Sequence, residues 1–180
     1  VQGKLTGLEK FFYDFYKAFC EGGRWKLYLN GVLSTLEVTV LALILGIVLG
    51  VVVAVVRTMH DQQRLGRKNP VLGVINAICK VYTTVIRGTP MMVQLMILGF
   101  VVFANSRNFT MVGVFGLGLN SGAYVAEIVR GGLMGVDSGQ NEAGRSLGLG
   151  YLDTMRFIII PQAFKNILPA LGNEFITLFK

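Results

Sequence analysis

Long apolar runs without charged residues constrain this sequence more than any other feature. Residues 38–56, 88–106 and 109–126 contain no Asp, Glu, Lys or Arg. A run of about 19 residues forms roughly 28 Å of α-helix, close to the thickness of the hydrocarbon layer of a membrane. The runs therefore predict membrane helices at these three places in the chain.

A fourth apolar segment, residues 157–180, is less regular. It is interrupted by Pro161, Lys165, Pro169 and Glu174. Because irregular backbone is tolerated at membrane depth only next to protein or water, the segment predicts a broken or kinked membrane helix. The fold class predicted for the chain is an all-α integral membrane protein with about four membrane helices.

The composition supports a membrane protein and argues against nucleic-acid binding. Of the 180 residues, 53% are hydrophobic and 15% are charged, which is rare in a soluble domain. The net charge of +7 arises largely from residues that flank the apolar runs, as in loops on the cytoplasmic side of a membrane. Cys20 and Cys79 provide neither a disulfide framework nor a metal cluster.

The distribution of positive charge predicts the topology. The segment 57–70 is interpreted as a loop rich in Lys and Arg, whereas the turn after residue 106 has only Arg107. The first loop and the segment 137–155 are therefore expected in the cytoplasm, and Arg107 outside. Five Lys and Arg residues before Gly31 would then lie outside, which an interfacial position of that segment would reconcile.

Two segments favour helices that lie on the membrane surface. Residues 1–30 include an aromatic stretch at 8–19 with interspersed Lys and Asp, typical of an amphipathic interfacial helix. Residues 71–87 have a polar stripe at helical spacing and are expected to form an interfacial helix that turns into the next span near Gly88. Small residues recur on one face of the first span, at Ala42, Gly46, Gly50 and Ala54. This spacing predicts a face for close packing against another helix, and an equally good explanation is that small residues are simply frequent in apolar helices.

A polar insert at residues 139–161 separates the last two apolar segments. Asp137 is placed as an N-cap with Gln140 three positions later, and Gly148 is placed just after a helix end. The spacing predicts a helix over 139–147. A helix of about two turns is unstable alone, so it requires a partner surface.

The insert resembles the EAA loop of the permeases of ATP-binding-cassette (ABC) transporters. Glu142, Ala143, Gly148, Ile158 and Pro161 match that loop, whereas Gly144 and Ile160 replace its usual Ala and Leu. Further blocks resemble the permeases for polar amino acids, in order along the chain from about Gly31 onward. They are 87–95, 123–132, 139–148 and 161–176.

The resemblance implies a type I ABC importer transmembrane domain over residues 31–180, after an interfacial segment at 1–30. Because the sequence starts at Val1 and stops at Lys180 inside a helical pattern, we expect both ends to be cut, with a further helix after Lys180. The loop implied to couple to an ATP-binding subunit comprises Glu142, Ala143, Gly144, Arg145, Ser146, Leu147 and Gly148.

The resemblance also implies partners and a location. These are ATP-binding subunits, a second permease subunit (identical or paralogous), an extracytoplasmic solute-binding protein and the plasma membrane of a prokaryote. The sequence contains no G-x-x-x-x-G-K-[ST] phosphate-binding loop. No cofactor is therefore expected on this chain, which is not expected to be an enzyme, and ATP and magnesium are assigned to the partner subunit.

Polar residues within the apolar segments are candidates for a substrate path, because such residues are costly in lipid. They are Gln94, Asn120, Tyr124, Asn173 and Glu174. For Asn173 and Glu174 a structural role fits equally well, and Glu127 is expected to pair with Arg130. The identity of the amino acid remains open. Alternatives are a permease for another small polar solute, a membrane-embedded enzyme or a channel.

Overall fold

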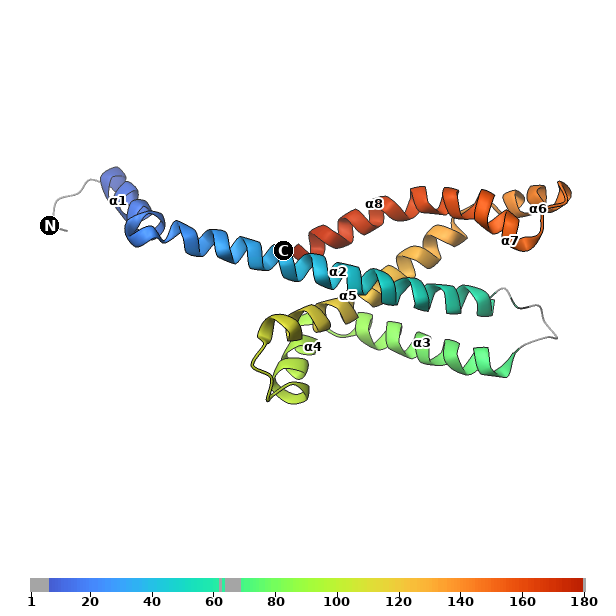
Figure 1. Cartoon of the computed structure of the whole chain (residues 1–180), viewed down its shortest axis with the longest axis horizontal. Coiled ribbons are helices and arrows are strands. Elements are labelled where there is room, and N and C mark those ends of the chain that lie inside the picture. Colours follow the sequence, from blue (N-terminus) through green and yellow to red (C-terminus); the bar gives the residue numbers. More distant parts are fainter. Residues whose placement is uncertain (1–6, 62, 64–68, 180) are drawn as a thin grey trace. The chain divides into compact units, whose positions relative to one another are not determined.

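The computed structural model describes residues 7–61, 63 and 69–179, almost all of them helical. It comprises two compact units, Val1–Glu37 and Val38–Lys180. The first contains α1 (Gly7–Phe19), a short 3₁₀ turn η1 (Glu21–Gly23) and the start of α2 (Trp25–Asp61) (Figure 1). Phe11, Phe15 and Phe19 stack along one side of α1. The expected aromatic helix is present, whereas α2 begins before the predicted boundary at residue 30.

The small residues of α2 form its packing face. Ala42, Gly46, Gly50 and Ala54 are all buried. A Cβ atom on Gly46 would lie 2.7 Å from Ser121 Oγ, and one on Gly50 would lie 2.6 Å from Val125 Cβ. The ladder therefore allows α2 to approach α5 (Phe109–Met134) at a distance that larger side chains would prevent.

The predicted loop at 57–70 is partly helical, and this corrects the sequence interpretation. Helix α2 continues to Asp61, and Asn69 caps α3 (Pro70–Gly88) by accepting a hydrogen bond from the Val71 N–H at 3.0 Å. Arg57 thus lies within α2. The other basic residues of the segment, Arg64, Arg67 and Lys68, are outside the described residues.

Helix α3 is a candidate membrane span that the sequence did not predict. Its 19 residues are long and apolar enough to cross a membrane, where the sequence predicted an interfacial helix. Thr83 of its polar stripe is buried and accepts a hydrogen bond from Arg57 of α2. The Tyr82 hydroxyl donates to the Leu119 carbonyl of α5. By contrast, the run 88–106 contains α4 (Met91–Ile97) and a π-helical turn η2 (Leu98–Val102). Twelve helical residues reach only about 18 Å.

Helix α5 is the centre of the second unit. Asn108 caps it by accepting from the Met111 N–H at 3.1 Å, and it extends to Met134, well past the predicted end at 126. After α6 (Ser138–Ser146), α7 (Tyr151–Thr154) and a π-helical turn η3 (Met155–Ile159), helix α8 (Ile160–Phe179) packs back against α5 (Figure 1). The buried core between α2, α5 and α8 consists of Ala54, Val125, Val129, Ala163 and Ile167.

The last helix is irregular at a different place from the one predicted. Helix α8 continues through Pro169, and the π-helical turn lies upstream at η3. Among the described residues, the helices long and apolar enough to cross a membrane are α2, α3 and α5. The predicted all-helical architecture is confirmed for the described residues, and α3 is a candidate span in addition to the predicted ones.

Candidate coupling helix and polar cluster

Helix α6 starts at the predicted cap. The Asp137 carboxylate accepts a hydrogen bond from the Gly139 N–H at 2.6 Å, and α6 covers Ser138–Ser146 where 139–147 was predicted. The side chain of Gln140 does not return to Asp137 as a capping box requires. Its Oε1 accepts from Gln162 Nε2 at 3.1 Å instead, which links the first turn of α6 to α8.

Gly148 ends the helix in a Schellman motif. Its φ of +81° lies in the left-handed region that favours glycine. The Gly148 N–H donates to the Arg145 carbonyl at 3.0 Å, and the Leu149 N–H donates to the Gly144 carbonyl at 3.1 Å. This pair of bonds defines the motif and confirms the predicted helix end.

Gly144 is the point where α6 contacts the segment that follows it. It is buried, and a Cβ atom there would lie 2.8 Å from Thr154 Cγ2 and 3.2 Å from Ile158 Cδ1. Thr154 is fully buried, and its hydroxyl donates to the Gly150 carbonyl at 3.0 Å. From sequence, Gly144 only weakens the helix, whereas in the structure it allows α6 to lie directly on α7 and η3.

The other side of α6 is open. Glu142, Ala143, Arg145 and Ser146 are exposed. Two leucines beside them are unusually accessible for their size, Leu147 at 79% and Leu152 at 77%. The two leucines lie just beyond the C-terminal end of α6, at its C-cap and in α7. A short helix with one packed face and one exposed face is available for helix-in-groove recognition.

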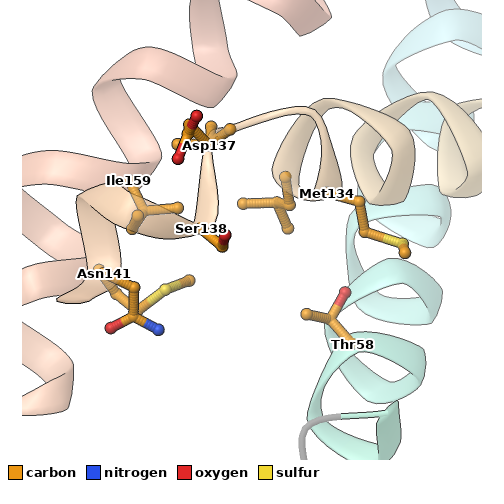
Figure 2. Close-up of a pocket in the computed structure, with 9 residues that line it drawn as sticks. Thr58, Met134, Asp137, Ser138, Asn141 and Ile159 are labelled. Atoms are coloured by element: carbon orange, nitrogen blue, oxygen red, sulfur yellow. The ribbon is translucent and has the colours of Figure 1, made fainter.

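A pocket of about 140 Å³ lies on the inner side of α6. Figure 2 shows Ser138, Asn141 and Ile159 on one side of it and Thr58 and Met134 on the other. The buried atoms Thr58 Oγ1 and Asn141 Oδ1 have no hydrogen-bond partner among the described residues. Helix α6 therefore packs against α7 and η3, and the pocket separates it from the ends of α2 and α5.

A second group of polar residues surrounds Glu127 on α5. Its Oε1 accepts a hydrogen bond from Arg57, and its Oε2 accepts from Nε and Nη2 of Arg130 at 3.2 and 3.1 Å. Arg57 also donates to Thr83 Oγ1 at 3.4 Å. The expected pair with Arg130 is confirmed. Arg57 was missed because the sequence placed it in a loop, and it connects α2 to α3 and α5.

Gln94 and Asn120, two candidates for the substrate path, are directly bonded to each other. Asn120 Nδ2 donates to Gln94 Oε1 at 3.0 Å. Gln94 Nε2 donates to the Ile86 carbonyl and to Thr89 Oγ1, both at 2.7 Å. These bonds tie the start of α4 to the end of α3 and to α5.

The remaining candidates occupy separate positions. Tyr124 is partly exposed, and the guanidinium of Arg87 lies over its ring at 5.3 Å from the centroid. Glu174 is buried beside Ser121, whereas its neighbour Asn173 is exposed. The structure thus brings Gln94 to Asn120 and Tyr124 to Arg87, and it places Asn173 and Glu174 on different sides of α8.

Taken together, the apolar helices packed through small residues define a multi-pass helical membrane protein, with a short exposed helix, α6, between α5 and α8. Residues 69–180 match the family model described as binding-protein-dependent transport system inner membrane component. That match covers more than half of the chain, which therefore belongs to this family.

Named relatives agree with the family. The chain is 43% identical over 125 residues to the putative glutamine transport system permease protein GlnP of Rickettsia bellii, and 42% identical over 125 residues to the arginine transport system permease protein ArtQ of Bacillus subtilis. Each match covers 61% of this chain and 57% of the relative. The chain thus spans somewhat more than half the length of these relatives.

A solved structure of an amino acid ABC transporter with histidines has the same fold. It superposes with a TM-score of 0.74 and 38% identity, covering 98% of this chain and 73% of that chain. The fold is therefore that of an ABC importer transmembrane domain, as the resemblance of the sequence implied.

Proposed function

We propose that this chain is the membrane-spanning permease subunit of an ABC importer that carries a polar amino acid across the plasma membrane of a prokaryote. The observation that carries the proposal is α6, a capped helix with its Glu142–Leu147 side exposed, in a chain of this family. Relatives are named for glutamine and arginine transport, which supports an amino acid as the substrate.

We infer that α6 transmits motion through its contacts with the segment that follows it. A groove on the ATP-binding subunit receives the exposed face of α6, as in helix-in-groove recognition. Because Gly144 lies against Thr154 and Ile158, a displacement of α6 is passed to α7 and η3. From there it reaches α8, which packs along α5. The pocket beside Thr58 and Asn141 gives α6 room to move relative to α2 and α5.

The complete assembly that we propose contains two ATP-binding subunits, which hold ATP and magnesium, and a second permease subunit, identical or paralogous. A solute-binding protein delivers the substrate from outside. Within this chain the proposed substrate path includes Gln94, Asn120, Tyr124, Asn173 and Glu174. Coupling in this assembly is a free-energy link between the nucleotide state and the direction in which the path opens.

Uptake in a reconstituted system tests the proposal. The full assembly is placed in liposomes with ATP inside and its binding protein outside, and a panel of radiolabelled amino acids is supplied. We expect ATP-dependent accumulation of one or a few polar amino acids. An assembly whose ATP-binding subunit is inactivated is the control. Accumulation of a different class of small polar solute, or equal flux without ATP, would contradict the proposal.

A further inference from the structure

Positive charge exceeds negative charge around Glu127. Arg57, Arg87 and Arg130 all lie within 4.0 Å of its carboxylate. Three guanidinium groups around one carboxylate leave two positive charges in excess, and no other acidic group in the described part of the chain forms an ion pair with these arginines. Excess cations between helices that are long and apolar enough to cross a membrane are costly, so such groups mark functional sites.

Arg87 is the arginine left available. The Glu127 oxygens are already hydrogen-bonded by Arg57 and Arg130, and Arg87 Nη1 is 3.9 Å from Oε1, beyond hydrogen-bond distance. Its side chain is 43% exposed, compared with 15% for Arg57 and 26% for Arg130. Among the described residues, its guanidinium donates no hydrogen bond. Its N–H groups are therefore free to bind an anion.

The Tyr124 ring gives Arg87 a defined orientation. The guanidinium lies over the ring, 5.3 Å from its centroid. A guanidinium that stacks on an aromatic face keeps the N–H donors at its edge available in a fixed fork. That fork matches the two oxygens of a carboxylate, to which Arg binds in bidentate geometry.

The surroundings of Arg87 are polar and firmly held. Gln94 donates to the carbonyl of Ile86, the residue before Arg87, and is itself bonded to Asn120 on α5. Asn120 precedes Tyr124 by one helical turn, so the amide pair and the stacked arginine lie next to each other. The hydrogen bonds of Gln94 and Asn120 go to protein groups, which fits a supporting role for this pair beside an exposed cation.

We propose that Arg87, stacked on Tyr124, binds the α-carboxylate of the transported amino acid on its way through the membrane. The inference rests on the proposed function and adds a specificity-determining residue to it. Every amino acid carries this carboxylate, so the site selects the class of substrate and leaves the choice of side chain to other residues. An amino acid whose carboxylate is replaced by a carboxamide should bind poorly.

Binding measured without the solute-binding protein isolates this site, because that protein could itself select for a carboxylate. The purified permease–ATPase assembly is incubated with tritiated L-glutamine or L-arginine, and the bound label is competed with the unlabelled amino acid or its carboxamide. In the wild type we expect the free acid to compete at a concentration about tenfold lower or more, the gain typical of a charge-assisted bidentate pair.

Variants of Arg87 separate recognition from structure. Arg87→Gln is expected to weaken binding of the acid and to reduce the preference for the acid over the carboxamide to about one, because the charge is lost. Arg87→Lys keeps the charge without the planar fork and should retain part of the preference. Arg107→Gln, which removes an exposed cation in the turn before α5, is the matched control and should leave the preference unchanged.

Each outcome decides the proposal. It is overturned if the wild type does not distinguish acid from carboxamide, a result that needs no variant to fold. A preference that survives in Arg87→Gln also overturns it, and if that variant does not assemble, a preference in Arg87→Lys that is as large as in the wild type does so. The proposal is also overturned if an assembly that imports the amino acid shows no bound label that the unlabelled amino acid can displace. If the wild-type assembly imports no amino acid at all, the proposed function itself has failed.

Discussion

Gly144 and Thr154 contact each other so closely that a Cβ atom on the glycine would lie 2.8 Å from Thr154 Cγ2 and 2.9 Å from its Oγ1. Thr154 is fully buried and cannot swing away without exchanging its hydrogen bond to the Gly150 carbonyl. This contact joins α6 to the segment that leads into α8. It explains why a glycine occupies a position in α6 at which helix propensity alone would favour alanine.

Gly144→Ala should therefore destabilise the contact in spite of its better helix propensity. Overpacking costs about 1–3 kcal/mol, against a propensity gain of about 1 kcal/mol. Adding Thr154→Ala removes both clashing atoms and should restore the loss, giving a coupling energy of roughly 1 kcal/mol or more in a double-mutant cycle. The measurement is thermal inactivation of the purified assembly.

Gly150→Ala is the control for this cycle, since a Cβ atom there would meet Asp153 Oδ2 at an ordinary 3.5 Å. Strictly additive effects of Gly144→Ala and Thr154→Ala would show that the contact does not join α6 to the following segment.

Glu127 is expected to stabilise the bundle by linking three helices. Glu127→Gln leaves the guanidinium groups of Arg57 and Arg130 without their carboxylate. Breaking a fully buried pair costs about 3–5 kcal/mol, and roughly 2–3 kcal/mol is expected here because these side chains keep some contact with solvent. The loss should appear as a lower temperature of thermal inactivation.

Adding Arg57→Gln to the Glu127→Gln variant tests whether the unpaired arginines cause the loss of stability. The double variant should be less destabilised than the sum of the single variants, because it removes one of the uncompensated charges. Glu37→Gln changes an exposed acid and should have little effect. A Glu127→Gln variant as stable as this control would show that the cluster contributes nothing to the fold.

Topology remains a prediction that labelling can test. We expect a cysteine at position 64 to be in the cytoplasm and one at position 107 to be outside, because basic residues concentrate around the first position. Position 64 lies outside the described residues, so the expectation rests on sequence alone. Cys20 and Cys79, both free, must first be replaced by serine.

An impermeant maleimide applied to intact cells should then label position 107 and not position 64. Labelling after permeabilisation controls for accessibility of position 64. The reverse pattern in intact cells would require the whole chain to be inverted in the membrane.

Local signals predicted the parts of the fold that local chemistry decides. The cap at Asp137 and the glycine at 148 located α6 within one residue, because both act on their own helix ends. The ladder from Ala42 to Ala54 pointed to the packing face of α2 because its spacing follows the helix. The charge-free runs at 38–56 and 109–126 lie within α2 and α5, because the length of an apolar run is also a local property of the sequence.

Features that depend on contacts between distant segments could not be predicted in this way. Arg57 looked like a loop residue because the end of a helix in a basic segment has no local marker, and its partner Glu127 is 70 positions away. That α3 is a candidate span was not predicted, because its contact with α5 through the Tyr82 hydroxyl and the Leu119 carbonyl joins residues 37 positions apart. The need for glycine at position 144 depends on Thr154, on a different helix.

The central claim is that α6 couples this chain to an ATP-binding subunit, and Ala143→Trp tests it most directly. Ala143 is exposed and lies outside every apolar span, so the variant should insert and fold normally. Glu142→Lys is a second probe, and Arg107→Gln is a control away from α6. Uptake, ATPase activity and co-purification of the ATP-binding subunit are measured for each in the reconstituted assembly.

We predict that Ala143→Trp abolishes amino acid uptake and lowers co-purification of the ATP-binding subunit, because a large side chain cannot enter the groove. Glu142→Lys should lower uptake through reversal of charge at the rim. The account would be contradicted if the Ala143→Trp assembly inserted, retained the ATP-binding subunit and transported amino acid at the wild-type rate.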